Sequence, residues 1–599
     1  MRSENDQVAC MAVEFWSTVC EEELEIQLQR EEIEGETDDL VSYNFAVVAI
    51  QDVLPTLLSL LTRQNDDPED DDWSVAMAAG ACLQLFAQNT GSHVIEPTLK
   101  FVESNLTSPN WRNKEAAVMA FGSILDGPER DQLRGLITQA LPPILALMKD
   151  ESLQVKETVS WCLGRIADLV VDSIDVQSTL PHILEALVQG FQDHPKVSTN
   201  CCWTLINLVE QLCSTAAESE SSAMSPFYGE LVPRLIQISA RNDNEHSART
   251  SAYEALSALV LYSSQNDLAV VNHIASESLE RLNKTIELQQ SPEASSASNE
   301  DKALLQELQA NILSLLTNVI RRIGGDIQSV SDQLMEKFLK LLQIQDSNSI
   351  IEEDIFIAVS SVATAVGRNF EAYMPSFLPF LTNALENTES PVCESAVGLV
   401  VDICHSLGDG FIPYCQGFMA ILGNSLSNGQ MRRELRPLIL SCFGDIASSI
   451  GQEFIQYLDV VMGICAQAQH LEPEDGSIET EDYILSVKEA VLDTYVGVIA
   501  GLHDQPAALA QYQMQIIEFL MTVFSNPVMS SSDPVCRSAV GMLGDLAQIY
   551  SDGSLKMVYQ QQWITDFIKK TRQNPRFTQS TKDTARWARE QQKLQLQLP

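Results

Sequence analysis

The sequence predicts an all-α protein, an α-solenoid superhelix of HEAT repeats, and three observations support this fold class. The segments Pro391–Ile403 and Pro534–Leu546 share Pro, Val, Cys, Ser, Ala, Val, Gly and Asp in register. Asp402 and Asp445 end similar segments 43 residues apart, and a period of about 40–47 residues is that of HEAT or armadillo units. Apolar residues recur in steps of three and four, and no alternation typical of strands persists.

Each period reads as two amphipathic helices. In order along the chain, we expect helix pairs at 38–90, 92–127, 129–170, 172–213, 226–263, 266–324, 327–368, 370–407, 409–451, 452–502, 504–550 and 553–595. We group them as residues 1–34, a second helix of a truncated repeat with an acidic linker; 38–213, four repeats that include the acidic loop 66–72; 226–451, five repeats; and 452–595, three C-terminal repeats with a basic tail.

The second helix of a period carries a buried stripe. Steps of three and four place one set of apolar residues on a single face. These are Val392, Ala396, Leu399, Ile403 and Leu407, matched by Val535, Ala539, Met542 and Leu546. Proline marks helix starts at Pro109, Pro391 and Pro534, and glycine marks helix ends at Gly408, Gly410 and Gly451.

The beginning of the chain departs from this pattern. Asn5–Cys20 has the apolar face of a second helix, but no first helix precedes it. Because a solenoid end normally carries a polar cap, we expect a fragment or a truncated gene model. The alternative is a genuine start with an unusual cap.

The charge of the chain indicates its partners. Lys and Arg number 37 and Asp and Glu 82, which leaves a net charge of −45. Such a chain repels a nucleic-acid backbone and an anionic membrane and favours basic partners. No run of about 18 uncharged apolar residues predicts a membrane span. The 13 cysteines form no CxxC pair and are expected to be reduced core thiols of a cytosolic or nuclear protein.

Polar segments and a basic tail complete the outline. We expect loops at Ser214–Ser225, Ser291–Asp301, His470–Asp482 and Glu31–Asp39, which are rich in Ser, Asp or Glu. The tail reverses the sign of the charge. Its basic residues are Lys569, Lys570, Arg572, Arg576, Lys582, Arg586, Arg589 and Lys593. Either these residues contact an acidic surface, or they are the solvent-exposed residues of the last helix.

No pattern predicts catalysis. The eight histidines are scattered without metal-ligand spacing, and no phosphate-binding glycine loop or nucleophile elbow occurs. We therefore expect no enzyme activity, no cofactor and no metal.

The strongest local signal is an acidic loop followed by a tryptophan. Its carboxylates are Asp66, Asp67, Glu69, Asp70, Asp71 and Asp72, and Trp73 follows them directly. Mutual repulsion and Pro68 disfavour a helix here. An Arg side chain could stack on Trp73 while its neighbours pair with the carboxylates. The alternative is a solvated loop before an ordinary N-terminal helix residue, and the residues alone favour neither.

Trp161 and Trp203 stand 42 residues apart, in the same register of successive second helices. A solenoid would stack them along one face, where indoles on an acidic surface can hold the guanidinium groups of a basic helix. The alternative is core packing, which the spacing alone favours.

At these residues the sequence resembles the importin-beta (karyopherin-beta) family of nuclear transport receptors, in order along essentially the whole chain. The motifs are Val13–Ser17, Asp70–Trp73, Ala78–Gly80, Pro109–Arg112, Ala117–Gly122, Trp161 with Gly164–Ile166, and Ala585–Trp587. The resemblance implies a receptor of the cytoplasm, the nucleus and the nuclear pore. Its inner surface would wrap the basic importin-beta-binding helix of importin-alpha, or a basic cargo. Ran-GTP would release the load, and Phe-Gly nucleoporins would dock between outer helices.

The resemblance also assigns site residues. The carboxylates of the acidic loop, with Trp73, Trp161, Trp203 and Trp587, fall on positions that engage the basic helix, and Asp70, Asp71 and Asp72 fall on a Ran contact. The negative charge and the lack of a long apolar run, noted above, predict no direct contact with nucleic acid and no membrane insertion.

Two departures from the family pattern are visible. Pro68 interrupts the acidic run, and the chain begins inside what resembles the seventh repeat. Because the missing repeats carry the principal Ran contact, we expect weakened Ran-GTP binding. The rival functions are a HEAT scaffold subunit of a multiprotein complex and a chaperone of basic proteins.

Overall fold

The computed structural model describes residues 1–32, 41–65, 73–241, 246–292, 294, 297–345, 350–472 and 477–598. The chain forms two compact units. Unit 1 comprises Met1–Glu280 with Ser314–Arg322, and unit 2 comprises Arg281–Leu313 with Ile323–Pro599. Within the described ranges every regular element is a helix, as the sequence predicts.

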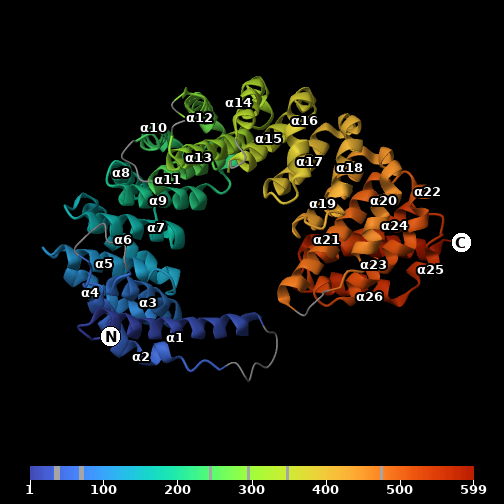
Figure 1. The fold of residues 1–599 in the computed structure, drawn as a ribbon. Helices are drawn as coiled ribbons and strands as arrows, with labels where there is room; N and C mark the ends of the chain where they lie inside the picture. The colour runs from blue at the N-terminus through green and yellow to red at the C-terminus, as the bar shows by residue number, and fades with distance from the viewer. Residues whose placement is uncertain are drawn as a thin grey trace. The chain divides into compact units, whose positions relative to one another are not determined.

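Unit 1 is a double layer of helices. Its elements are α1 (Asp6–Glu32), α2 (Phe45–Leu60), α3 (Val75–Thr90), α4 (Ile95–Asn105), α5 (Trp111–Ser123), α6 (Arg130–Ala146), α7 (Leu153–Leu169), α8 (Leu180–Gly190), α9 (Pro195–Cys213), α10 (Tyr228–Ile238) and α11 (His246–Leu261). The second helices α3, α5, α7, α9 and α11 pack one against the next, and α1 extends this layer beside α3. The first helices form the other layer, as α8 beside α9 and α10 beside α11 illustrate in Figure 1.

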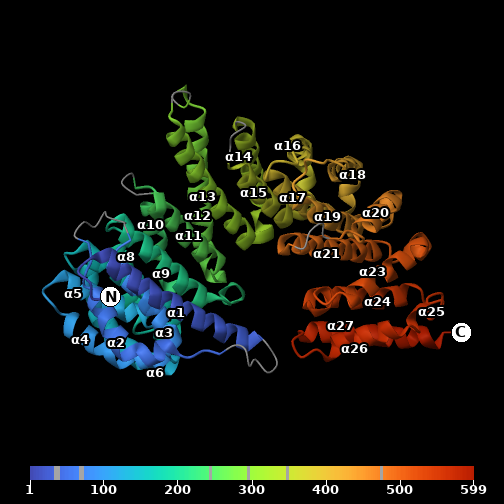
Figure 2. The same ribbon diagram turned by 60° about the horizontal axis from the view of Figure 1, so that its bottom comes forward.

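Unit 2 repeats the same arrangement. Its elements are α14 (Ser331–Ile344), α15 (Glu352–Val366), α16 (Met374–Glu386), α17 (Val392–Leu407), α18 (Ile412–Leu426), α19 (Leu435–Ile450), α20 (Ile455–Ala468), α21 (Ile478–Gly501), α22 (Pro506–Leu509), α23 (Gln513–Ser525), α24 (Asp533–Ile549), α25 (Lys556–Tyr559), α26 (Gln562–Gln573) and α27 (Gln579–Gln597). The helices α15, α17, α19, α21, α24 and α27 pack in sequence as the second-helix layer, and Figure 2 shows α24 above α27. The long helices α12 (Leu268–Gln289) and α13 (Asn299–Ile323) are each divided between the units.

The helices follow the order of the expected pairs, and the grouping of these pairs into larger segments stays a prediction. Two expected loops are wrong at their C-terminal ends, because α13 already begins at Asn299 and α21 at Ile478. Serine caps explain the difference. Ser298 Oγ accepts from the Asp301 backbone N–H at 3.0 Å while the Asp301 carboxylate accepts from the Ser298 N–H, and Ser477 Oγ accepts from the Thr480 N–H. Each cap satisfies a backbone donor at the helix start.

Glycine ends several second helices. Gly91, Gly367, Gly408 and Gly451 cap α3, α15, α17 and α19 with φ between 54° and 57°. Side chains disfavour this left-handed half of backbone space, so glycine is the residue that can turn the chain there. The expectation that Gly408 and Gly451 mark helix ends is confirmed.

The expected buried stripe of the second helices is present. Ala396, Leu399, Ile403 and Leu407 are buried in α17, while Val392 is half-buried and its neighbour Cys393 is buried instead. In α24, the stripe from Val535 to Leu546 is buried as expected. All thirteen cysteines are free thiols, and all except Cys10 are buried.

Lysine and aspartate pairs connect successive repeats of unit 1. Lys114 on α5 forms an ion pair with Asp150, which precedes α7. One repeat later, Lys156 Nζ lies 2.6 Å from Asp193 Oδ2, ahead of α9. All four side chains are largely shielded from solvent. Burial alone would raise the pKa of Asp150, but hydrogen bonds from Lys114 and the backbone outweigh it and lower that pKa.

Two stretches, Val392–Leu426 and Leu435–Ala468, are long and apolar enough to span a membrane by length and composition. Each consists of two helices joined by a 3-10 turn at Gly408 or Gly451. In each stretch, about half of the most apolar 18-residue window is buried within the protein, as in core helices of a helical solenoid.

Candidate binding surfaces

The second-helix layer of unit 1 carries Trp161 on α7 and Trp203 on α9, and both side chains are half-buried. We call this pair the tryptophan ladder. Each indole inserts one edge at a glycine of the preceding second helix. A Cβ atom added at Gly122 would lie 2.5 Å from Trp161 Cζ3, and one added at Gly164 would lie 2.1 Å from Trp203 Cζ3. Contacts this short cannot exist, so the glycines create the space that the rings occupy.

This geometry is compatible with both interpretations of the tryptophan ladder, core packing and ligand binding. One edge of each ring is packed in the solenoid, as the core interpretation requires, and the half-buried indoles retain exposed surface that a ligand can reach. Hydrogen bonds from α9 to α7 hold the two rungs in register. Asn200 Nδ2, Thr204 Oγ1 and Asn207 Nδ2 donate to backbone carbonyls of α7 at 3.2, 3.1 and 3.3 Å.

The register of the ladder continues toward the N-terminus with methionine. Met119 Sδ on α5 lies 3.4 Å from the position of a Cβ added at Gly80. One repeat earlier, Met77 on α3 is 44% exposed. The same position therefore holds two flexible thioethers and then two indoles, a change of side chain that the spacing of the tryptophans alone could not indicate.

Trp73 lies outside this register. It is 58% exposed and directly precedes Ser74, whose Oγ caps α3 by accepting from the Met77 N–H. The indole of Trp73 is therefore accessible to a ligand, and its role in binding stays a prediction. The loop itself, with Asp66, Asp67, Glu69, Asp70, Asp71 and Asp72, lies outside the described residues.

Gln64, two residues before the acidic loop, is anchored by a buried carboxylate. Gln64 Nε2 donates to Glu115 on α5 and to the Arg112 backbone carbonyl. Thr158 Oγ1 on α7 donates to the same Glu115 carboxylate at 2.8 Å. Burial raises the pKa of Glu115 to about 7, although both hydrogen bonds favour the ionised form. One side chain thus ties three successive repeats together.

Trp587 on α27 belongs to unit 2 and has the same environment as the ladder. A Cβ added at Gly544 on α24 would lie 2.1 Å from Trp587 Cζ3, and the indole is half-buried. Three of the four predicted tryptophans therefore share one packing motif, a ring edge set against a glycine of the preceding second helix. Two of them lie together in unit 1.

Unit 2 carries an acidic feature that sequence reasoning missed. Asp402, Asp445, Asp493 and Asp545 lie on α17, α19, α21 and α24, and we call them the aspartate row. Each of the first three is bonded to the preceding second helix. Ser360 donates to Asp402, His405 Nε2 lies 3.5 Å from Asp445 Oδ1, and Ser441 Oγ donates to Asp493 Oδ2 at 3.4 Å. The spacing of Asp402 and Asp445 was visible as a repeat marker, but not as a charged surface.

Three carboxylates of the aspartate row have raised pKa values, although Asp493 is exposed and the Asp445 side chain is 38% exposed. Burial raises the pKa of Asp445, His405 partly opposes this, and the charge of Asp402 adds to it. Burial also raises the pKa of Asp493, with added repulsion from Asp445 and Glu489, and the pKa of Asp545. Closely spaced carboxylates that repel one another gain stability when a cation comes between them. The row is therefore electrostatically suited to a basic ligand.

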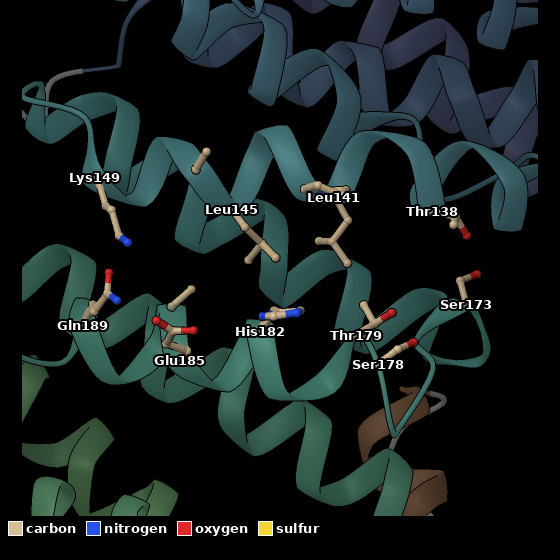
Figure 3. Close-up of a pocket in the computed structure, with 13 residues that line it drawn as sticks. Thr138, Leu141, Leu145, Lys149, Ser173, Ser178, Thr179, His182, Glu185 and Gln189 are labelled. Carbon is tan, nitrogen blue, oxygen red and sulfur yellow. The ribbon is translucent and has the colours of Figure 1, made fainter.

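The first-helix layer of unit 1 contains a groove between α6 and α8, with a cavity volume of about 480 Å³. Figure 3 shows Leu141 and Leu145 of α6 facing His182 and Glu185 of α8, with Lys149 and Gln189 at one end. The complete lining is Thr138, Leu141, Pro142, Leu145, Ala146, Lys149, Ser173, Ser178, Thr179, His182, Glu185, Ala186 and Gln189. An apolar floor with polar ends is typical of a site for one or two apolar side chains.

In the part of the chain that the structure describes, no three His, Cys, Asp or Glu side chains are grouped so that they could hold a metal ion. The surfaces that stand out are therefore the tryptophan ladder, the aspartate row and the first-helix groove. All three are suited to binding polypeptides.

Comparisons with known proteins agree with this description. Residues 182–572 match the family described as importin subunit beta-1-like, TPR repeats, and residues 111–166 match a HEAT-like repeat. The chain is 51% identical over 598 residues to importin subunit beta-1 of Saccharomyces cerevisiae, covering 100% of this chain and 68% of that protein.

Two solved structures are similar over the whole chain and 68% of their own length, each at 50% identity. One is a Kap95:Nup1 complex, with a TM-score of 0.88. The other is Kap95p, whose binding induces the switch loops of RanGDP to adopt the GTP-bound conformation, with a TM-score of 0.73.

Proposed function

The chain belongs to the importin subunit beta-1 family of nuclear import receptors, and we propose that its second-helix face binds the basic importin-beta-binding helix of importin-alpha or a basic cargo. The observation that carries this proposal is the tryptophan ladder. Glycines at Gly122 and Gly164 fix two indoles in register and leave them partly accessible. Arginine side chains of a helical ligand can stack on these faces.

The acidic surfaces supply the second part of the interaction. The aspartate row in unit 2 offers carboxylates that gain from a cationic partner. The carboxylates of the acidic loop add to the same attraction, and Trp73 and Trp587 serve as further contacts for arginine. Complementary charge accelerates encounter and weakens with salt, while stacked contacts slow dissociation.

Ran would control release. Kap95p, which is 50% identical to this chain, binds Ran, and we extend that property to this chain as a proposal. The acidic loop, in particular Asp70, Asp71 and Asp72, is the contact that we assign to Ran-GTP. In this scheme binding and release need no chemical step by the receptor, which moves between cytoplasm and nucleus through the nuclear pore.

Passage through the pore requires contact with nucleoporins, and we place one such contact at the α6–α8 groove. The related Kap95 forms a complex with Nup1. The groove lies on the first-helix face, so Phe-Gly segments could bind there while a basic ligand occupies the other face. Its volume of about 480 Å³ and its Leu141 and Leu145 floor suit a phenyl ring.

Replacing Leu145 by serine should weaken binding of a Phe-Gly peptide about tenfold, because the ring loses a large part of its apolar contact. Fluorescence anisotropy with a labelled peptide measures the change. The matched control is Gln139→Ala, an exposed change on α6 that does not line the groove. Equal affinities of the two variants would place the nucleoporin contact elsewhere.

The proposed function is tested by binding of a fluorescent importin-beta-binding helix at low and physiological salt, with and without Ran-GTP. We expect binding that weakens with salt and is reversed by Ran-GTP. If the helix binds but Ran-GTP does not displace it, the proposed ligand stands and the proposed release by Ran-GTP is wrong. No binding at either salt concentration would favour a HEAT scaffold.

A further inference from the structure

A second groove on the first-helix face differs from the α6–α8 groove in chemistry. It lies between α23 and α26, entirely within unit 2, and has a cavity volume of about 380 Å³. Phe524, Phe567 and Phe577 supply apolar walls, and Lys570 and Gln573 line it with polar groups. The volume falls in the range of sites that accept a large side chain.

The aromatic wall is an organised cluster that includes the cation. The ring centroids of Phe524 and Phe567 are 5.4 Å apart. Trp563 extends the cluster, with its ring centroid 6.2 Å from that of Phe524. Lys570 Nζ lies 4.8 Å from the Phe524 centroid, a cation–π distance. The ammonium group therefore stands at the apolar wall rather than being directed away from it.

The groove also lies in the part of the sequence where the charge is positive. Between Asp566 and Lys593 there are eight basic residues and three acidic ones, in a chain whose net charge is −45. Lys569 and Lys570 are exposed on α26, and neither forms a salt bridge with any described residue. An unpaired cation beside an aromatic wall attracts a carboxylate that accompanies an apolar group.

We propose that the α23–α26 groove binds acidic peptide segments in which a phenylalanine or a large aliphatic residue stands next to carboxylates. The apolar side chain packs on the accessible face of Phe524, whose other side is covered by Phe567, and a neighbouring carboxylate pairs with Lys570. The exposed amide of Gln573 can hydrogen-bond the peptide backbone at the rim. This ligand has the opposite charge to the one assigned to the second-helix face, so the proposal goes beyond the proposed function.

An uncharged Phe-Gly segment is the competing occupant. It would cover the Lys570 ammonium without supplying a counter-charge, and removing a charged group from water without a partner is costly. The carboxylate of an acidic segment avoids that cost, so its charge should raise affinity as well as specificity.

The test uses the full chain and short labelled peptides, measured by fluorescence anisotropy at low salt. One peptide has a single phenylalanine flanked by glutamates, the second has glutamines in their place, and the third is a neutral Phe-Gly sequence. We expect the glutamate peptide to bind about tenfold more tightly than the other two. Equal affinities, or tighter binding of the Phe-Gly peptide, would overturn the proposal.

Charge reversal locates the site. Lys570→Glu should abolish the preference for the glutamate peptide, whereas Lys593→Glu, the same change on exposed α27 outside the groove, should retain most of it. Equal losses in the two variants would mean a diffuse attraction to the basic tail and would overturn the assignment. The basic importin-beta-binding helix serves as an independent ligand, and its unchanged affinity for both variants shows that the receptor is folded. A loss of acidic-peptide binding is thereby distinguished from a loss of basic-helix binding, which would contradict the proposed function.

Discussion

Replacing Trp161 and Trp203 together by alanine is expected to weaken binding of an arginine-rich helix about 100-fold, roughly 3 kcal/mol. Tryptophans at the centre of an interface commonly dominate its binding energy, and here two of them would lose their stacking on guanidinium groups. Calorimetry with the importin-beta-binding helix measures the loss. Circular dichroism should show unchanged helix content, because both indoles are half-buried at the surface of the second-helix layer and are not enclosed in the core.

Two control variants separate the ladder from general damage. Trp111→Ala removes a tryptophan at the start of α5, outside the ladder, and should leave the affinity unchanged. Trp203→Phe retains an aromatic ring near Gly164 and should give an intermediate loss. If the double alanine variant kept the affinity of the unmodified receptor, the ladder would be a packing feature alone.

Replacing Asp445 and Asp493 together by asparagine is expected to change affinity and stability in opposite directions. Binding of the basic helix should weaken at least tenfold and depend less on salt, because two carboxylates of the aspartate row are neutralised. The ligand-free protein should melt at a higher temperature near neutral pH. There the unmodified protein must keep two partly desolvated, mutually repelling carboxylates ionised.

The sign of the pH dependence follows from the raised pKa values. A group whose pKa is higher in the folded than in the unfolded state contributes stability below the unfolded pKa, about 3.9 for aspartate. That contribution is lost as the pH rises through the folded pKa. As the pH rises through the folded pKa, ionisation of the aspartate row also makes it attractive to a basic ligand. We therefore expect affinity to rise and thermal stability to fall with increasing pH.

Melting temperature and anisotropy, measured across this pH range on both proteins, check the prediction. The asparagine variant should show a smaller change in each quantity. The control is Asp172→Asn, an exposed aspartate of unit 1 outside the aspartate row. A variant that lost affinity but melted at a lower temperature would show that these carboxylates stabilise the free protein, contrary to their raised pKa values.

The fold could be predicted because a repeat is visible in sequence. The match of Pro391–Ile403 with Pro534–Leu546 gave the period, and the apolar steps of three and four gave the helices. The residues at which α13 and α21 begin could not be predicted. The caps at Ser298 and Ser477 lie inside stretches rich in Ser, Asp and Glu, and this composition predicts a loop. The capping hydrogen bonds stabilise a helix start there instead.

The candidate sites could be predicted only in part. The register of Trp161 and Trp203 was readable, but whether an indole is buried or accessible depends on the residue opposite, and Gly122 and Gly164 become its neighbours only in the folded chain. The two first-helix grooves gave no signal, because each combines residues of separate helices whose spacing follows no motif. The structure was needed to show that Asp402, Asp445 and Asp493 lie close enough for their charges to repel one another.

The glycine opposite each tryptophan also constrains how this sequence can change over evolutionary time. Any side chain at Gly164 would collide with the indole of Trp203, and the same holds for Gly544 with Trp587. A side chain at the glycine is therefore compatible with the stacked helices only if the opposite tryptophan has changed to a smaller residue. Across related sequences these positions should vary as linked pairs, so that the loss of an indole frees its glycine to become alanine or serine.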